Sequence, residues 1–196
     1  MRRRSILTRW MAAVAPEAFA IWITGLPASG KSTLTKAVEA RLAARGVDVA
    51  VLESDELRRV LTPKPRYDEK ERESFYAQTI WIGTLLVRHG VPVIFDATAN
   101  RRNWRERARQ AIPRFVEVYV ECSLEVCMAR DPKGIYRRAR QGDAGTVPGL
   151  QAAYEPPRQA DIVVAGDRES PECAAGRVIE LLIEKGYLAR DGDAPG

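Results

Sequence analysis

The chain has 196 residues, of which 45% are hydrophobic and 29% are charged, and its formal net charge is +5 at pH 7. This length suits one globular domain with a sizeable core, and because no run of 18 apolar residues occurs, no membrane-spanning helix is expected. The excess of positive charge favours anionic partners such as nucleotides or nucleic acid, without choosing between them.

The ends of the chain are predicted to lie outside the domain. Residues 1–18 are basic, and Arg9 interrupts their apolar stretch, which leaves too little for a signal peptide. We therefore expect a flexible lead-in at 1–18, one domain at 19–187 and a disordered tail at 188–196.

Apolar runs alternate with amphipathic stretches along the domain. Strands are predicted at 19–25, 47–53, 91–96, 114–122 and 160–166, and helices at 31–45, from 55 onward, and at 68–89, 101–111, 124–130 and 171–185. Strands that alternate with helices at this spacing imply a parallel sheet with helices on both faces. In such folds ligands bind at the carboxyl ends of the strands.

A glycine-rich loop lies between the first predicted strand and its helix. "GLPASGKST" fits the pattern G-x-x-x-x-G-K-[ST] with Gly25, Gly30, Lys31 and Ser32. The backbone N–H groups of such a loop converge on phosphates, with the lysine on the β- and γ-phosphates and the serine hydroxyl on Mg²⁺. The sequence thus indicates a P-loop protein that binds a nucleoside triphosphate, with a three-layer α/β/α fold and a five-stranded parallel sheet.

The second strand leads into "LESDELRR", which places Asp55 beside the phosphate loop. A carboxylate there can orient Mg²⁺ through water, or accept the proton of a hydroxyl group that attacks the γ-phosphate. The alternative is that Asp55 only caps the helix that follows. Arg58, one turn further on, suits bidentate contact with an anionic acceptor.

The third strand ends in "VIFDATANRR" and delivers Asp96 to the same edge of the sheet. Asp96 can assist Asp55 on the acceptor's side of the site. The alternative is a structural acid that caps the next helix or pairs with Arg101 or Arg102.

A polar segment at 131–149, rich in glycine and arginine, is predicted to be a basic lid. Lys133 and nearby arginines supply positive charge that can close over phosphates, and Gly134 and Gly142 are candidate pivots. The alternative is a merely solvated basic loop. Closure matters in a kinase because water competes with the acceptor.

Metal and thiol chemistry at cysteine is not expected. Cys122, Cys127 and Cys173 form no CxxC pair, and the only histidine, His89, lies before Gly90 where a helix should end. We predict buried free thiols in a reducing cytoplasm.

Several segments together resemble the adenylylsulfate kinase (APS kinase) family of P-loop kinases. They are the phosphate loop, "LESDELRR", the run "VYVECSLEVCMARDPKGIYRRARQG" and "AYEPP", and the resemblance extends from about residue 19 to 185. The family phosphorylates the 3′-hydroxyl of adenylylsulfate with MgATP to give PAPS, and usually forms homodimers. The resemblance implies the same reaction here, in sulfate activation.

The resemblance also implies residue roles, with Lys31 and Asp55 as the catalytic pair. The ATP-binding residues are then Gly25, Leu26, Pro27, Ala28, Ser29, Gly30, Lys31, Ser32, Thr33, Arg130 and Lys133. The acceptor-binding residues are Asp55, Arg58, Tyr67, Arg72, Arg102, Lys133 and Val147, and the strand-end position of Asp96, which the resemblance does not explain, adds Asp96 to this set. Mg²⁺ is held by Ser32, with Asp55 acting through water.

The departures from the family pattern fall on the acceptor side. The family's Asp-Gly-Asp is Glu53-Ser54-Asp55 here, its Ser-Pro-Tyr-Arg is Ala99-Asn100-Arg101-Arg102, a family asparagine is Phe75 and a lid phenylalanine is Val147. Because Ala99 replaces the serine, no covalent phosphoserine is available at that position. The family also has a small residue where this chain has Asp96.

Two other functions stay open on the sequence. A strand-end acid followed by arginines is reminiscent of polynucleotide kinases, so the acceptor can be another nucleotide derivative or a nucleic-acid 5′-hydroxyl. Trp104 can stack on a base, although an aromatic packed against the core is the simpler interpretation. The third possibility is a regulatory domain that binds a nucleotide without acceptor chemistry.

Overall fold

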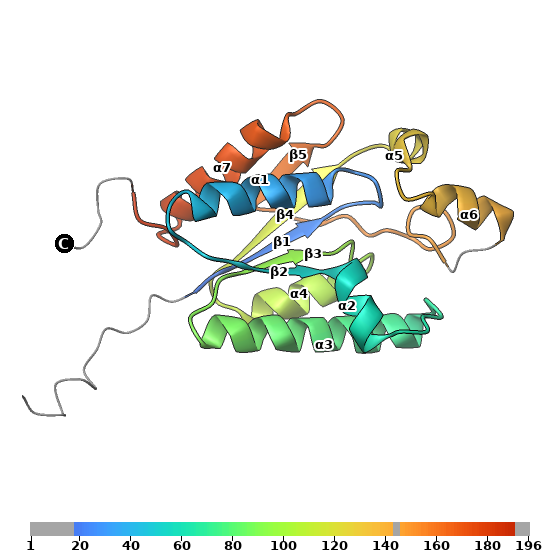
Figure 1. The fold of residues 1–196 in the computed structure, drawn as a ribbon, viewed down its shortest axis with the longest axis horizontal. Helices are drawn as coiled ribbons and strands as arrows, with labels where there is room; N and C mark the ends of the chain where they lie inside the picture. The colour runs from blue at the N-terminus through green and yellow to red at the C-terminus, as the bar shows by residue number, and fades with distance from the viewer. Residues whose placement is uncertain (1–17, 143–145, 191–196) are drawn as a thin grey trace, which may run out of the picture.

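The computed structural model describes residues 18–142 and 146–190. A five-stranded sheet forms the centre of the molecule (Figure 1). Its strands are β1 (Ala20–Thr24), β2 (Ala50–Glu53), β3 (Val93–Asp96), β4 (Phe115–Glu121) and β5 (Ile162–Ala165). They lie in the order β2-β3-β1-β4-β5, and every neighbouring pair is parallel. The predicted five-stranded parallel sheet is confirmed.

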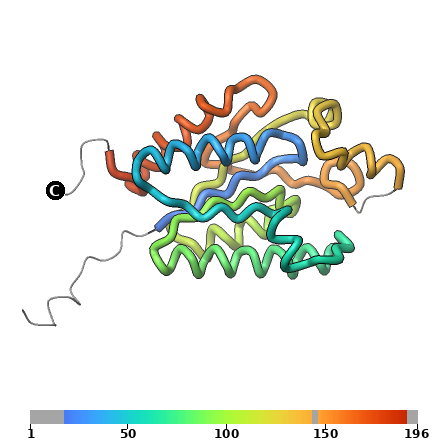
Figure 2. Tube along the Cα trace, in the orientation of Figure 1, coloured from blue at the N-terminus to red at the C-terminus, as the bar shows by residue number. Residues whose placement is uncertain are grey.

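Helices cover both faces of the sheet, which confirms the three-layer α/β/α fold (Figures 1 and 2). One layer holds α1 (Lys31–Ala43) and α7 (Pro171–Glu184), and the other holds α2 (Ser54–Leu61), α3 (Glu69–Arg88) and α4 (Arg102–Ala111). Two short helices, α5 (Leu124–Arg130) and α6 (Ile135–Gln141), stand beyond the carboxyl ends of the strands. None of the helices in the described ranges has the length and hydropathy that a membrane span needs.

The core on the α3–α4 side is aromatic. Trp22 stacks on Phe95 at 4.6 Å between ring centroids, and Tyr76 stacks on Trp104 at 4.4 Å. Trp104 is 1% exposed, and its indole N–H donates to Glu73. A buried, hydrogen-bonded indole cannot stack on a nucleic-acid base, so the interpretation of Trp104 as a core residue is confirmed.

Helix α3 lies close against β3 because Gly83 faces the Phe95 ring. A Cβ at position 83 would overlap this ring. The close approach holds β3 firmly, and β3 carries Asp96 at its carboxyl end.

The lid segment contains a helix that the sequence analysis did not predict. Helix α6 begins after Gly134 and ends at Gly142, and both glycines have left-handed backbone angles, with φ of 63° and 81°. Tyr136 and Ala139, three residues apart, are buried on one face of α6. The glycines predicted as pivots are therefore the caps of a short amphipathic helix.

The prediction for the cysteines is only partly correct, and the predicted domain bounds are largely untested. Cys122 and Cys127 are buried as predicted, but Cys173 is exposed, because it lies in the first turn of α7 on its solvent side. The predicted lead-in and tail lie outside the described residues except for Ala18 and residues 188–190, so the domain bounds stay a prediction. Leu188 packs against the core and its N–H donates to Leu182 O.

Candidate active site

The phosphate loop runs from the end of β1 to the start of α1. Gly25 has a φ of 156°, and a Cβ there would lie 2.6 Å from Val120 O, so the loop can approach β4 only with glycine at this position. Gly30, with a φ of 108°, precedes the first turn of α1. The helix N-terminus and the loop amides thus face the same space, as a phosphate requires.

Lys31 lies in this loop with its ammonium group held inward. Its Nζ donates to Leu26 O at 2.8 Å. Burial lowers the pKa of Lys31 from 10.5, and the nearby carboxylate of Asp96 is the strongest influence in the opposite direction. Phosphate oxygens can replace the carbonyl as partners of the ammonium group, which then stabilises their negative charge.

The loop forms one wall of a cavity of about 550 Å³, here called the nucleotide cavity. Lys31, Ser32 and Thr33 line it from α1, and Arg130 and Lys133 line it from the lid side. Arg130 also donates to Gly166 O at 2.8 Å, which joins α5 to the loop after β5. Six of the nine predicted loop residues line this cavity together with these two basic residues, whereas Gly25, Leu26 and Ser29 do not line it.

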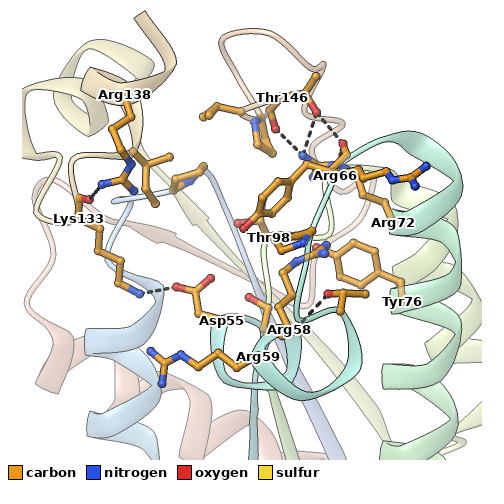
Figure 3. A pocket seen from close by; sticks show the side chains of 18 of the residues that line it. Asp55, Arg58, Arg59, Arg66, Arg72, Tyr76, Thr98, Lys133, Arg138 and Thr146 are labelled. Atoms are coloured by element: carbon orange, nitrogen blue, oxygen red, sulfur yellow. Dashed lines mark hydrogen bonds and ion pairs between the residues drawn. The ribbon is translucent and has the colours of Figure 1, made fainter. Parts of the chain in front are cut away.

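Asp55 lies where this cavity meets a second one. The N-cap of α2 is Glu53, so Asp55 is in the first turn and is not the helix cap. Lys133 Nζ lies 2.6 Å from Asp55 Oδ2 and 3.6 Å from Glu53 Oε1, and the hydrogen bond to Asp55 raises the pKa of Lys133 (Figure 3). Both side chains of the Lys133–Asp55 pair are half exposed, so the pair contributes only about 0–1 kcal/mol and substrates can displace it.

The second cavity, here called the acceptor cavity, has a volume of about 670 Å³. Arg58 is its central cation: the guanidinium carbon lies 3.9 Å from the Phe75 ring centroid and 5.1 Å from that of Tyr67. Arg58 also donates to Glu71 at 3.0 Å. Phe75, which stands where the family has asparagine, is therefore the surface on which Arg58 rests.

Arg72 ties the wall of the acceptor cavity to the lid. It donates to Tyr67 O and to Thr146 (Figure 3). It also donates to Asn100 Oδ1 at 3.2 Å, and burial lowers its pKa. Tyr67 itself has a φ of 60°. Asn100, a departure from the family, thus holds Arg72, while Val147 contributes an apolar lining without an aromatic face.

Five of the described arginines line the acceptor cavity. Arg59, Arg66 and Arg138 line it together with Arg58 and Arg72 (Figure 3). Such an assembly suits an acceptor that carries several negative charges.

Two predicted acceptor residues lie elsewhere. Arg102 is absent from the lining of both cavities, and its Nε donates to Pro156 O at 3.1 Å. Asp96 lines the nucleotide cavity and not the acceptor cavity. The structural alternative for Asp96 is wrong within the described residues, because Arg101 pairs with Glu69 and Glu155, and no side chain caps α4.

Thr98 is a site residue that the sequence analysis missed. It lines both cavities, and its carbonyl oxygen accepts a hydrogen bond from Thr24 at 2.7 Å. Its position two residues beyond a strand end that carries an acid was the available signal. Its place between the two cavities becomes visible only in the structure, where Thr98 lines both of them.

Known proteins share this sequence and fold. The family described as adenylylsulphate kinase matches residues 17–165, more than half of the chain. An adenylyl-sulfate kinase of Microcystis aeruginosa is 38% identical over 168 residues, covering 86% of this chain and 93% of the relative. A probable adenylyl-sulfate kinase of Archaeoglobus fulgidus is 40% identical over 150 residues, covering 76% and 97%.

The structural comparison agrees with the sequence comparison. The APS kinase of Mycobacterium tuberculosis, solved in complex with AMPPNP and APS, has a TM-score of 0.80 and 31% identity, covering 86% of this chain and 99% of that one. Family match, relatives and fold together confirm the resemblance inferred from the motifs. The chain belongs to the adenylylsulphate kinase family.

Proposed function

We propose that this protein is an ATP-dependent kinase that transfers the γ-phosphoryl group of ATP to the 3′-hydroxyl of adenylylsulfate, giving PAPS and ADP. The observation that carries the proposal is the position of Asp55 at the junction of a phosphate-binding cavity and an arginine-lined cavity. A related APS kinase of the same fold was solved with AMPPNP and APS, an ATP analogue and this acceptor.

Each cavity supplies a distinct part of the reaction. Lys31 and the loop amides bind the β- and γ-phosphates, and Arg58 and Arg72 bind the anionic end of the acceptor. Asp55 accepts the proton of the acceptor hydroxyl as its oxygen bonds to the γ-phosphorus and the bond to the ADP oxygen breaks. Lys133, released from Asp55, then faces the phosphates from the lid.

The residues of the nucleotide cavity fit Mg²⁺. The Ser32 hydroxyl and the carboxylates of Glu53, Asp55 and Asp96 all line it, and oxygen is the donor that Mg²⁺ prefers. A Mg²⁺ ion bound with ATP would supply positive charge that offsets the negative charge of the phosphates. Among the described residues no group of three or more His, Cys, Asp or Glu side chains forms a metal site by itself, which suits a metal that arrives with the nucleotide.

We also propose that the protein acts as a homodimer. Trp81 and Leu85 support this proposal, because these large apolar side chains lie four residues apart on α3 and are exposed. Sedimentation equilibrium at the assay concentration is expected to give twice the monomer mass of 21.8 kDa, and a monomer would contradict the proposal.

The acceptor is tested by comparing ATP consumption with adenylylsulfate, with other nucleotides and with oligonucleotides that carry a 5′-hydroxyl. Lys31→Ala serves as the blank, and the product is identified by anion-exchange chromatography. We expect adenylylsulfate to give the highest kcat/KM. A higher kcat/KM with another acceptor would show that adenylylsulfate is not the substrate. If no acceptor raised ATP consumption above the blank, the proposed kinase activity would be wrong and a regulatory nucleotide-binding domain would be favoured.

A further inference from the structure

Arg105 is a buried arginine that lines neither the nucleotide cavity nor the acceptor cavity. It lies in α4 and is 1% exposed, and its Nε donates to Glu117 Oε1 on β4 at 2.7 Å. Apolar side chains of similar volume often pack as stably as a buried ion pair. Holding α4 on the sheet therefore does not by itself account for this arginine.

The other two nitrogens of this guanidinium group bind backbone carbonyls of two separate segments. The first segment follows β3 and is called here the β3 loop, residues 97–101; Nη1 donates to Ala99 O and, at 3.4 Å, to Arg101 O. The second segment follows the lid and is called here the strap, residues 153–156; Nη2 donates to Glu155 O at 2.6 Å. One side chain of α4 thus joins the β3 loop to the strap.

Asn100 lies between the two residues of the β3 loop whose carbonyls this guanidinium group binds. Its side chain accepts a hydrogen bond from Arg72 at 3.2 Å and donates to Ala153 O of the strap at 2.9 Å. Its own carbonyl accepts a hydrogen bond from the N–H of Glu155 at 2.8 Å. The position of Arg72 in the wall of the acceptor cavity therefore depends on how the β3 loop is held.

The β3 loop contains a backbone conformation that its sequence does not favour. Ala99 has a φ of 38°, in the left-handed region that residues other than glycine rarely adopt. Its N–H donates to Tyr76 Oη at 3.0 Å, and its carbonyl accepts from Arg105. Such a conformation persists where the surrounding contacts impose it, so Arg105 contributes to the shape of this loop.

We propose that Arg105 is a positioning residue for the acceptor: it fixes Asn100 through the carbonyls on either side, and Asn100 fixes Arg72 at the acceptor cavity. A lysine cannot take its place, because a carboxylate and carbonyls from two segments require the planar fork of N–H donors that only arginine has. The inference deepens the proposed function and rests on it, since it concerns the acceptor of that reaction.

The test compares Arg105→Lys with Arg107→Lys in the full chain, with ATP and adenylylsulfate as substrates. We expect Arg105→Lys to lower kcat/KM for adenylylsulfate about 10–100-fold, mainly through KM, because misplaced binding groups cost up to this much. Its ATP affinity, measured by calorimetry, should change little, because Arg105 does not line the nucleotide cavity. Arg107→Lys makes the identical change on the same helix, at an exposed pair with Glu73, and should behave as the native protein.

A double-mutant cycle tests the route through Asn100. If Arg105 acts through Asn100, the loss of kcat/KM in Arg105→Lys combined with Asn100→Ala should be close to the larger of the two single losses. Losses that multiply would show that Arg105 acts by another route. An unchanged kcat/KM in folded Arg105→Lys would confine its role to stability, and either result overturns the proposal.

Thermal unfolding checks that each variant is folded at the assay temperature. If Arg105→Lys is not, Arg105→Met combined with Glu117→Met takes its place, since an apolar pair often restores the stability that a buried ion pair provides. This variant also lacks the bonds to the carbonyls, so the same loss with adenylylsulfate is expected, and an unchanged kcat/KM would contradict the proposal.

Failure of this inference and failure of the proposed function are distinguishable. If the native protein turns over adenylylsulfate and Arg105→Lys does so equally well, only the inference is wrong. If the native protein does not phosphorylate adenylylsulfate, the proposed function is wrong, and hydrogen–deuterium exchange without substrate still examines Arg105. The β3 loop and the strap should then exchange faster in Arg105→Lys than in Arg107→Lys, and equal exchange would overturn the inference whatever the acceptor.

Discussion

Replacing Asp55 by asparagine is expected to lower kcat by about 10²–10⁴-fold while ATP affinity changes little, because general-base assistance contributes in this range. The asparagine amide can still lie at the junction of the two cavities and accept a hydrogen bond, but it cannot take the proton of the acceptor hydroxyl. It also no longer provides the charge that raises the pKa of Lys133. Steady-state kinetics with saturating ATP and acceptor measure the effect.

A matched control is available on the same stretch of chain. Asp48→Asn makes the identical change in the exposed loop before β2, at the end of that strand remote from the cavities, and should leave kcat unchanged. If Asp55→Asn kept a kcat within a few-fold of the native protein, Asp55 would have no catalytic role. If it lost ATP affinity instead, its role would be in nucleotide binding.

Replacing Lys31 by alanine is expected to have the other large effect, about 10²–10³-fold in kcat together with weaker ATP binding. Lys31 is the one cation held inside the phosphate loop of the described structure, where its Nζ is bonded to Leu26 O. Removing it leaves the γ-phosphate without a fixed positive charge during transfer. Lys36→Ala, on the exposed face of the same helix, is the control and should behave as the native protein.

The pH dependence of ATP affinity provides a second measurement on Lys31. Burial lowers the pKa of Lys31 below 10.5, and only the protonated form attracts the phosphates. ATP affinity should therefore be present at pH values below this lowered pKa and should fall as the pH rises through it. The fall is expected to be absent in Lys31→Ala, and an identical alkaline loss in that variant would assign it to another group.

The fold and the phosphate loop could be predicted because their signals are local. Apolar runs of strand length, the glycines at 25 and 30 and the lysine that follows depend on residues adjacent in the chain. The same signals predicted a strand-to-helix context for the loop, and the structure has it. Helix α6 was missed because its buried face, Tyr136 and Ala139, is too short for periodicity to reveal.

The acceptor side needed contacts between distant segments. Phe75 replaces an asparagine of the family, and in the structure its ring packs against Arg58 of another helix. Asn100 accepts a hydrogen bond from Arg72, which lies 28 positions away in the sequence. Cys173 was predicted to be buried from residue type alone, but the first turn of α7 directs it outward. The contacts of Arg58 with Phe75 and of Arg72 with Asn100 cannot be inferred from the spacing of residues along the chain.

By itself the sequence determined the class of fold, the phosphate loop and membership of a kinase family, since each depends on local pattern or on motifs that relatives share. Only the tertiary structure decided which cavity each strand-end acid serves. Asp55 lies two residues beyond β2 and Asp96 is the last residue of β3, and the sequence assigns both to the acceptor side. The packing of β3 between β2 and β1 places Asp96 in the lining of the nucleotide cavity, because a side chain's surroundings are set by its neighbours in the sheet.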